Sequence, residues 1–309
     1  NLFRKIAFHV EHELEKILVC PICGGESYKK HVEGKDHNVS GKVFSITECV
    51  GCGFRFTNPR PKEEHIYKYY QSKNYISHSS SKKGLINKVY HLVRSYQFYK
   101  KKEIIQRSSN TKKGEILDIG CGTGDFLKYM ASSGWQADGV ETDKGAKMIA
   151  EKKLGKKIEE NLDLLSGEKK YDVISMWHVL EHVYNVEKYL KKVNKLLKDN
   201  GVLVVGVPNC ESYDAKKYKG NWVAYDLPIH LSHFRKNNIE DLAKKSSFEL
   251  KEIKPLFFDA YYIGMLSAKK SGSSIVSGFL HGLISNFKAK KSGEYSSLIY
   301  FLFKQGLRP

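Results

Sequence analysis

The sequence contains no run of about 18 or more apolar residues, the length that a membrane-spanning helix needs. Residues 1–19 carry charged side chains throughout and lack the apolar core of a secretory signal. Arginine is scarce, and the net charge of +18 comes mostly from lysines spread along the whole chain. Because arginine is the better reader of phosphates and bases, this diffuse charge does not favour a nucleic-acid partner. We therefore expect a cytoplasmic protein, with nucleic acid only as a secondary candidate partner.

Four of the six cysteines form two C-x-x-C pairs, each beside glycines. A two-residue spacer lets both thiolates of a pair reach one Zn²⁺ ion, and glycine allows the tight turn around it. Disulfides are the alternative, but nothing in the sequence indicates secretion. The pattern predicts a structural zinc ribbon with a strand at 42–46 and four ligands: Cys20, Cys23, Cys49 and Cys52. Cys121 and Cys210 stand apart, and we expect them to be ordinary buried residues.

The segment after the ribbon predicts a helical connector. Asn58-Pro59-Arg60-Pro61 is expected to end the ribbon, because proline disfavours regular structure. From Glu63 to about Lys113 we expect helices, interrupted by a serine-rich bend at 77–81. The many aromatic residues of this connector are expected to pack against the main domain. The alternative is a lid in which Tyr75 or His78 covers the ligand.

A glycine-rich segment follows the first strand of the main domain. The strand at 114–120 leads into Cys121-Gly-Thr-Gly124 and a helix at 125–133, and glycines let a ligand lie against bare backbone. The next strand ends in Glu141, 21 positions beyond Gly120, where a carboxylate can accept both ribose hydroxyls. The G-x-G-x-G spacing differs from the G-x-G-x-x-G of dinucleotide folds, whose helix N-terminus holds a pyrophosphate. The pattern therefore favours a cofactor that has a ribose but no phosphate.

The segment Leu117-Asp-Ile-Gly-Cys-Gly-Thr-Gly-Asp-Phe-Leu127 resembles the class I S-adenosylmethionine-dependent methyltransferases, and the likeness covers about residues 113–260. Trp177-His-Val-Leu-Glu-His-Val183, after a strand at 171–176, is similar to the motif that follows strand 4 in these enzymes. The resemblance implies S-adenosylmethionine as the cofactor. It also implies a set of cofactor-binding residues: Asp118, Gly120, Cys121, Gly122, Thr123, Gly124, Glu141, Thr142, Leu162, Asp163, Trp177 and His178.

The same resemblance implies the fold class: an α/β domain with a Rossmann-like, seven-stranded sheet and helices on both faces. Apolar residues at helical spacing predict a helix at 186–197, with Gly201 placed to end it. Further strands are expected at 202–208, 248–258 and 296–303. Between the last two, residues 274–287 predict a helix with one apolar face and lysines at both ends. Core or dimer packing is its expected role. The alternatives are a cover for the substrate pocket and contact with an anionic membrane surface.

The histidines after strands 4 and 5 are the candidates for chemistry. His178, Glu181 and His182 share one face of a helical turn, and His230 and His233 follow later. This set resembles ubiquinone-pathway O-methyltransferases and small-RNA 2′-O-methyltransferases, which are metal-assisted and use E-x-x-E-H here. His178 replaces their glutamate, which argues against Mg²⁺ and leaves a softer metal or none. In many relatives without a metal, the Glu and His brace the loop instead.

We expect a histidine general base, because a hydroxyl acceptor must lose its proton as the methyl group arrives. His178 is the first candidate, and His233 or His230 is the second. The sequence thus predicts a zinc ribbon at 1–61, a connector at 62–112 and a methyltransferase domain at 113–309, with a helical insertion at about 265–292.

This order of modules resembles two groups of enzymes: sugar C-methyltransferases with a four-cysteine module, and a ribosomal-RNA guanine methyltransferase group. We expect methyl transfer to an oxygen (or carbon) of a small-molecule, sugar or lipid-like acceptor. The alternative is an RNA methyltransferase in which the ribbon and the lysines hold RNA. The identity of the acceptor and the oligomeric state are left open by the sequence.

Overall fold

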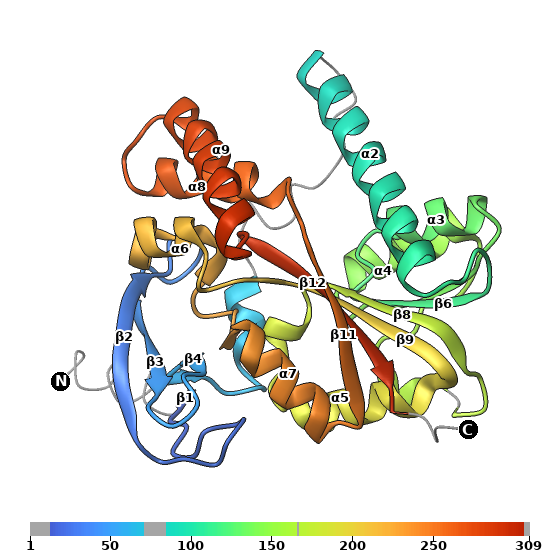
Figure 1. Cartoon of the computed structure of the whole chain (residues 1–309), viewed down its shortest axis with the longest axis horizontal. Coiled ribbons are helices and arrows are strands. Elements are labelled where there is room, and N and C mark those ends of the chain that lie inside the picture. Colours follow the sequence, from blue (N-terminus) through green and yellow to red (C-terminus); the bar gives the residue numbers. More distant parts are fainter. Residues whose placement is uncertain (1–12, 71–84, 166, 306–309) are drawn as a thin grey trace.

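The structure, a computed structural model, describes residues 13–70, 85–165 and 167–305, and the side chains of helix α2 from Arg94 onward. Its centre is a six-stranded sheet with the strand order β11-β12-β9-β8-β6-β7 (Figure 1). The strands are β6 (Glu115–Ile119), β7 (Gln136–Val140), β8 (Tyr171–Trp177), β9 (Leu197–Pro208), β11 (Phe248–Pro255) and β12 (Ser297–Lys304). The first four are parallel, whereas β12 is antiparallel to both β9 and β11.

The seven strands expected from the sequence need one correction. Among the described residues, the main sheet has six strands, and the place beside β7 holds only an isolated parallel bridge between Val140 and Glu159. The chain that follows α4 therefore returns to the edge of the sheet beside β7 without forming a strand there. The predicted fold class, an α/β sheet covered by helices on both faces, is confirmed.

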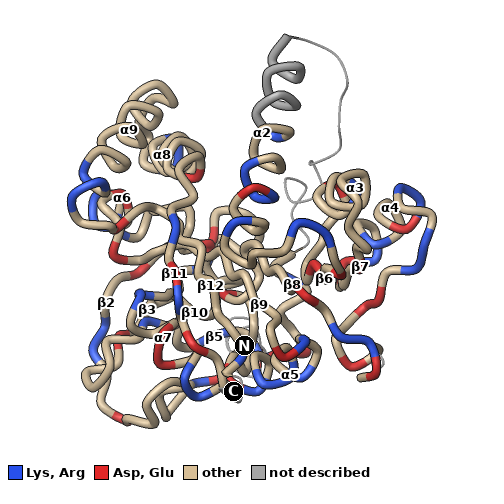
Figure 2. Tube along the Cα trace, turned by 45° about the vertical axis from the view of Figure 1, so that its right-hand side comes forward, with Lys and Arg blue, Asp and Glu red and all other residues tan. Residues whose placement is uncertain are grey.

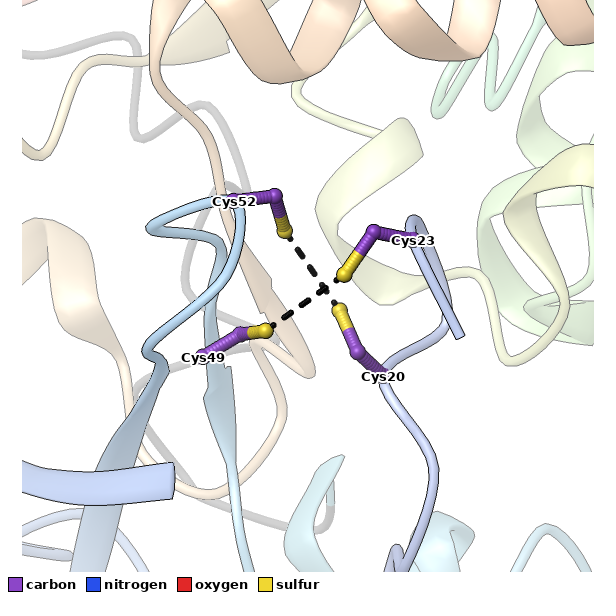
Figure 3. A group of neighbouring side chains, drawn as sticks. All are labelled: Cys20, Cys23, Cys49 and Cys52. Atoms are coloured by element: carbon purple, nitrogen blue, oxygen red, sulfur yellow. Dashed lines mark hydrogen bonds between the residues drawn. The ribbon is translucent and has the colours of Figure 1, made fainter. Parts of the chain in front are cut away.

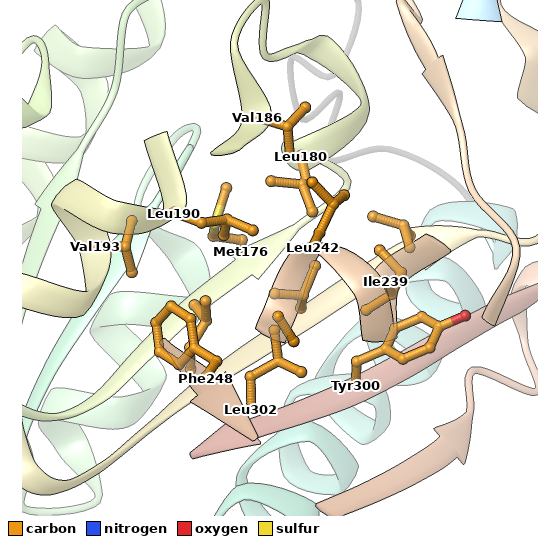
Figure 4. Packing of buried hydrophobic residues seen from close by; sticks show 14 of the residues in the cluster. Met176, Leu180, Val186, Leu190, Val193, Ile239, Leu242, Phe248, Tyr300 and Leu302 are labelled. Carbon is orange, nitrogen blue, oxygen red and sulfur yellow. The ribbon is translucent and has the colours of Figure 1, made fainter. Parts of the chain in front are cut away.

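Two buried clusters cover the two faces of the sheet. On one face, α5 (Val186–Leu196) and α7 (Lys236–Lys245) pack on β8, β9, β11 and β12 (Figure 4). On the other face, α2 (Leu85–Ser108), α3 (Asp125–Ser132) and α4 (Lys144–Leu154) pack on β6, β7 and β8. The amphipathic pattern of α5 explains its position, since Val186, Leu190 and Val193 all lie in the first cluster. The parallel strands are thus buried on both faces.

Gly201 does not end α5, so that prediction is wrong. The helix begins after Asn185, whose side chain accepts a hydrogen bond from Lys188 N, and ends as Leu197 turns to extended backbone. Gly201 lies inside β9, where an added Cβ would meet the carbonyl oxygens of Lys198 and Tyr171 at 2.9 and 3.0 Å. The glycine is therefore needed for close backbone packing rather than for helix termination.

The ribbon is a four-stranded sheet with the order β10-β4-β3-β2. Its strands are β2 (Tyr28–Lys35), β3 (Val43–Cys49), β4 (Arg55–Thr57) and β10 (Ser232–His233). The last strand comes from the main domain, so the ribbon expected within residues 1–61 is completed by residues far along the chain. In Figure 1 the ribbon stands beside α6 and α7.

The prolines after β4 do not stop regular structure, which corrects a third expectation. Arg60–Pro61 forms strand β5 and pairs antiparallel with β1 (Leu14–Glu15). Proline has no N–H to donate to a neighbouring strand, but it is tolerated here because β5 is a two-residue edge strand. The connector continues with the 3₁₀ helix η1 (Ile66–Tyr70) and with α2. The serine-rich bend, Tyr75 and His78 lie outside the described residues.

The predicted insertion is a helical hairpin rather than one helix. It consists of α8 (Asp259–Lys270) and α9 (Ile275–Ser292), beside the short helix α6 (Tyr213–Tyr218). The expectation that the apolar face of 274–287 packs in the core is wrong, because its large side chains are exposed. In the part of the chain that the structure describes, no helix is long and apolar enough to cross a bilayer. The remaining short helices are η3 (Leu162–Leu164), η4 (Leu180–His182), η5 (Lys219–Asn221) and η6 (Val223–Tyr225).

Candidate active site

The glycine loop lies where the carboxyl ends of β6, β7 and β8 meet, the edge at which ligands bind in open α/β sheets. Gly120, Gly122 and Gly124 all have positive φ, at 69°, 55° and 73°. A Cβ on Gly120 would collide with Val179, whereas one on Gly122 would meet nothing within 4 Å. The loop thus packs tightly beneath Gly120 and leaves bare backbone open at Gly122.

Glu141 is joined to this loop directly. Its Oε2 accepts a hydrogen bond from Gly122 N at 2.7 Å, and its Oε1 accepts one from Asp143 N at 2.8 Å. Asp143 in turn caps α4 by accepting from Ala146 N. The acid at the end of β7 is therefore held against the glycine loop, where the sequence motif requires it.

Asp118 lies below the loop rather than on it. It is buried and accepts a 2.5 Å hydrogen bond from Ser175 Oγ of the neighbouring strand. Burial raises the pKa of Asp118 to about 7, although the bond from Ser175 and the charge of Lys101 oppose the rise. In this structure Asp118 joins β6 to β8 through this bond, and its contact with the cofactor stays a prediction.

The other expected cofactor residues lie around the same edge. Cys121 is buried under the loop, which raises the pKa of its thiol, and Cys210 is buried elsewhere, as predicted. Thr123 Oγ1 donates to Asp125 at 2.8 Å, in the first turn of α3. Leu162 is buried in the core, whereas Thr142 and Asp163 are exposed, and Asp163 pairs with Lys192.

The ring of Trp177 holds a cation. Lys101 of α2 places its Nζ 4.0 Å from the centroid of the Trp177 ring, close enough for a cation–π interaction. Burial lowers the pKa of Lys101 to about 8, while Asp118 and Asp259 partly oppose that shift. The ring face and the two carboxylates thus offset only part of the cost of burying this charge.

His178 follows Trp177 with a positive φ of 56° and lies between two carboxylates. Its Nε2 is 3.0 Å from Asp259 Oδ2, and its Nδ1 is 3.4 Å from Glu181 Oε1. Burial opposes its charge, but the two carboxylates prevail and raise the pKa of His178 to about 10. The imidazole is therefore charged at neutral pH, which does not suit the expected general base.

Behind His178, Glu181 is grouped with two further histidines. One ligand atom each from Glu181, His182 and His230 lie within 4.8 Å of one another, and the two imidazole rings meet edge to face with centroids 4.6 Å apart. Both Glu181 oxygens are buried without a hydrogen bond among the described residues. The two Nδ1 atoms face the carbonyl oxygens of Ile229 and Ala224, at 3.1 and 2.9 Å. A carbonyl only accepts, so each Nδ1 carries the proton and each Nε2 keeps its lone pair.

His233 is not part of this group. It lies in β10, buried, with its Nε2 3.1 Å from Thr57 Oγ1 of the ribbon and its ring edge to face with Tyr225. Burial, with His230 nearby, holds the pKa of His233 well below its ordinary value. The structure thus brings His178 and His230 to the same polar cluster and assigns His233 to the joint between ribbon and domain.

The four cysteines of the ribbon form one cluster. Cys20 and Cys52 have their sulfur atoms 3.6 Å apart, and those of Cys23 and Cys49 are 3.5 Å apart (Figure 3). Zinc–thiolate bonds of about 2.3 Å place the sulfurs of a tetrahedral site roughly 3.8 Å apart. Four cysteines at this spacing fit a structural zinc ion, and they leave no position for a substrate.

Two residues of the active-site edge were missed by the sequence analysis: Lys101 and Asp259. Neither lies in a recognisable motif, since Lys101 is one of many lysines in the connector and Asp259 falls between the predicted strand at 248–258 and the predicted insertion. The signal in the sequence was weak. Asp259 is the one acidic residue between Leu256 and Gly293, and this isolation could have indicated a specific partner.

The fold, the glycine loop and the acid at the end of β7 are those of an α/β enzyme of the class I methyltransferase type, whose cofactor contains a nucleoside. Residues 93–253, more than half of the 309, match a family model described as a methyltransferase domain, and the chain belongs to this family. It is an S-adenosylmethionine-dependent methyltransferase.

Two similar curated proteins are both ubiquinone biosynthesis O-methyltransferases. The protein from Pelagibacter ubique (strain HTCC1062) is 30% identical over 179 residues, covering 52% of this chain and 75% of the relative. The protein from Rickettsia conorii (strain ATCC VR-613 / Malish 7) is 27% identical over 169 residues, covering 51% of this chain and 58% of the relative.

The fold is shared with solved methyltransferase structures. Magnesium protoporphyrin IX methyltransferase from Synechocystis PCC 6803, with bound SAH, aligns with a TM-score of 0.52 at 13% identity, over 79% of this chain and all of that one. A sarcosine dimethylglycine methyltransferase structure from Galdieria sulphuraria aligns with a TM-score of 0.50 at 13% identity, over 69% of this chain and 88% of that one. At this identity the likeness supports the fold alone.

Proposed function

We propose that this enzyme transfers a methyl group to a hydroxyl oxygen of a small-molecule acceptor. The observation that carries the proposal is Glu181, a buried carboxylate that lies between the charged His178 and two neutral histidines. The similar proteins that are named O-methyltransferases support the same reaction type. A hydroxyl acceptor must lose a proton, and this cluster supplies groups that can take it.

The residues fit S-adenosylmethionine, which supplies a methyl group on a positively charged sulfur when it is bound. Gly122 leaves its backbone open, and Glu141 stands beside it to accept the ribose hydroxyls. Trp177 offers a ring face that a cation can contact, as Lys101 Nζ does here.

His182, His230 and Glu181 are the groups of this cluster that are free to accept the proton, because His178 already carries one. Their pKa values are lowered, so each is a weak base that holds the proton only briefly before it passes to solvent. Burial and the neighbouring His230 lower the pKa of His182 to about 4, and burial also lowers the pKa of His230. Both imidazoles are therefore neutral at physiological pH, with free Nε2 lone pairs. His178 keeps its proton, and its ion pairs with Asp259 and Glu181 orient the cluster.

The function is tested with a labelled methyl group. We expect wild-type protein to transfer tritiated methyl to the small-molecule or lipid fraction of a cell extract that is separated from protein and RNA. Glu181→Gln should slow this transfer about 100-fold or more, the range of general acid–base catalysis, while cofactor affinity stays within about twofold. Glu187→Gln, which alters a half-buried acid on α5, is the matched control. Label in RNA would overturn the proposal.

The trio Glu181, His182 and His230 also has the composition of a metal site with two nitrogens and one oxygen, so metal content is a necessary check. We expect about one zinc per chain, held by the ribbon, and an unchanged content in Glu181→Gln. About two metals per chain, falling to one in this variant, would mean that a bound metal activates the acceptor hydroxyl.

The charge of His178 leads to a pH prediction. Because its folded pKa is raised above 6.5 to about 10, its ion pairs stabilise the fold fully below pH 6.5 and progressively less up to about pH 10. Urea unfolding should therefore show the largest advantage of wild type over Asp259→Asn near about pH 6, and a shrinking advantage as the pH rises. The methyl-transfer rate should stay level between about pH 6.5 and 9. A tenfold rise per pH unit in that range would instead identify His178 as the base.

A further inference from the structure

Helix α9 packs on α8 with its small residues. Its buried side consists of Gly278, Gly282, Ser285, Asn286 and Ala289. A Cβ added to Gly278 would lie 2.5 Å from Met265 Cα, and one added to Gly282 would lie 2.8 Å from Tyr261 Cα. The two helices therefore meet backbone to backbone. The ring of Phe279 stacks on that of Tyr261 of α8, with centroids 5.0 Å apart, at the edge of this contact.

The opposite side of α9 is apolar and exposed. We call it the outer face, and its side chains are 40–75% exposed: Ile275, Val276, Phe279, Leu280, Leu283, Ile284 and Phe287. Nearby on the same hairpin, Tyr262 is 58% exposed, and Phe257 and Phe258 are exposed just before α8. Seven adjacent apolar side chains on one helix are more than a soluble surface normally presents, so this face is an interaction surface.

The surroundings of the outer face are positively charged. Between Leu256 and Gly293 the chain has five lysines and one acid, Asp259, which is bound to His178. Helix α6 packs beside α9 through a 2.9 Å hydrogen bond between Tyr218 and His281, and it adds exposed Lys217. Within the described part of the chain, no ion pair neutralises Lys217, Lys269, Lys288, Lys290 or Lys291. Figures 1 and 2 show the hairpin projecting from the body of the molecule.

The positive charge around the outer face favours an anionic lipid surface over a second copy of the chain. A second copy of the chain that covered the outer face with its own would bring two sets of lysines together, which costs electrostatic free energy. An anionic lipid surface offers both an apolar layer for the side chains and phosphate charges for the lysines. Lys290 and Lys291 lie three and four positions after Phe287, so they continue the outer face and can reach the headgroups.

We propose that the α8–α9 hairpin docks this enzyme on the surface of an anionic lipid bilayer, with the outer face of α9 at the boundary between headgroups and acyl chains. The same hairpin is part of the active site, because α8 begins at Asp259 and Asp259 holds His178. Phe258, one residue earlier, packs edge to face with Tyr96 of α2. Docking therefore brings the edge that carries His178 towards the bilayer, whatever the acceptor is.

Binding to vesicles tests the proposal without any methyl transfer. The full chain, loaded with zinc, is sedimented with vesicles of phosphatidylcholine alone or with about 30% phosphatidylglycerol. Phe279→Ser with Leu283→Ser removes two apolar side chains from the outer face, and Lys290→Glu with Lys291→Glu reverses two charges beside it. The matched control is Met148→Ser with Ile149→Ser, two exposed apolar residues of α4 on another part of the surface. Cofactor binding shows that each variant is folded.

We expect wild type and the α4 control to bind the anionic vesicles at least about tenfold better than either hairpin variant. Wild type should also bind the anionic vesicles better than pure phosphatidylcholine. Equal binding by the control and the hairpin variants would overturn the proposal, as would wild-type protein that stays in solution. A dimer in sedimentation equilibrium that Phe279→Ser with Leu283→Ser converts to monomer would assign the outer face to a second copy instead.

Discussion

Replacing Glu141 with alanine is expected to weaken S-adenosylmethionine binding about 100-fold or more. The Glu141 carboxylate accepts hydrogen bonds from the backbone of Gly122 and of Asp143. Its removal would therefore loosen the glycine loop and also take away the proposed acceptor of the ribose hydroxyls. Hydrogen bonds to a charged group contribute about 1.5–3 kcal/mol each. Losing the two bonds expected from the ribose hydroxyls to Glu141 therefore lowers the affinity for the cofactor about 100-fold or more. Titration calorimetry with the cofactor measures the effect directly.

Two further variants separate the role of Glu141 from general damage. Glu141→Gln keeps the size of the side chain and one carbonyl acceptor, and we expect it to lie between wild type and Glu141→Ala. Glu168→Ala removes an exposed acid from the loop before β8 and should leave the affinity unchanged. If Glu141→Ala binds the cofactor as wild type does, the ribose site lies elsewhere and the assignment of the loop is wrong.

Removing the zinc ion is expected to unfold the whole protein, and not the ribbon alone. Cys20 and Cys49 belong to the same buried cluster as Leu203 and Val205 of the central sheet, together with Phe54 of the ribbon. A structural zinc ion contributes on the order of 10 kcal/mol to a small domain, which approaches the whole stability of a typical fold. Cys49→Ser should therefore abolish the folded state, or lower its melting temperature sharply, in calorimetry.

The control for the zinc prediction is Cys121→Ser, which replaces a buried cysteine outside the cluster. It should keep about one zinc per chain, whereas Cys49→Ser should keep almost none. Two separate melting transitions, with only the first sensitive to a chelator, would contradict the shared core and make the ribbon an independent module.

The parts of the site that could be predicted from the sequence are those in which chemistry and spacing are local. Two C-x-x-C pairs, three glycines between a strand and a helix, and an acid at the end of the next strand each have few physical explanations. The structure groups the four cysteines in one cluster and bonds Glu141 to Gly122. The sequence also indicated the order of strands and helices, because buried parallel strands and amphipathic helices have different periods.

The remaining parts depend on partners that are distant in the chain. A histidine near neutral pH is a reasonable base until Asp259, 81 positions later, raises its pKa to about 10. The buried side of α9 also could not be predicted from periodicity. The pattern shows that Phe279 and Leu283 lie on the same side of the helix, but not whether that side faces the protein or the solvent. The small residues Gly278 and Gly282 decided it, by allowing α8 to approach the backbone.

The pairing of Ser232 and His233 with Phe56 and Arg55 has a consequence for protein engineering. A chimera that carried only residues 13–61 onto another methyltransferase would leave one edge of β4 bare and remove the partner of Thr57. The recipient would also lack Phe234, which packs against Phe54 at a ring distance of 5.9 Å. The ribbon and the segment at 232–234 therefore form one structural unit made of two separate stretches of chain. A chimera must carry both stretches together.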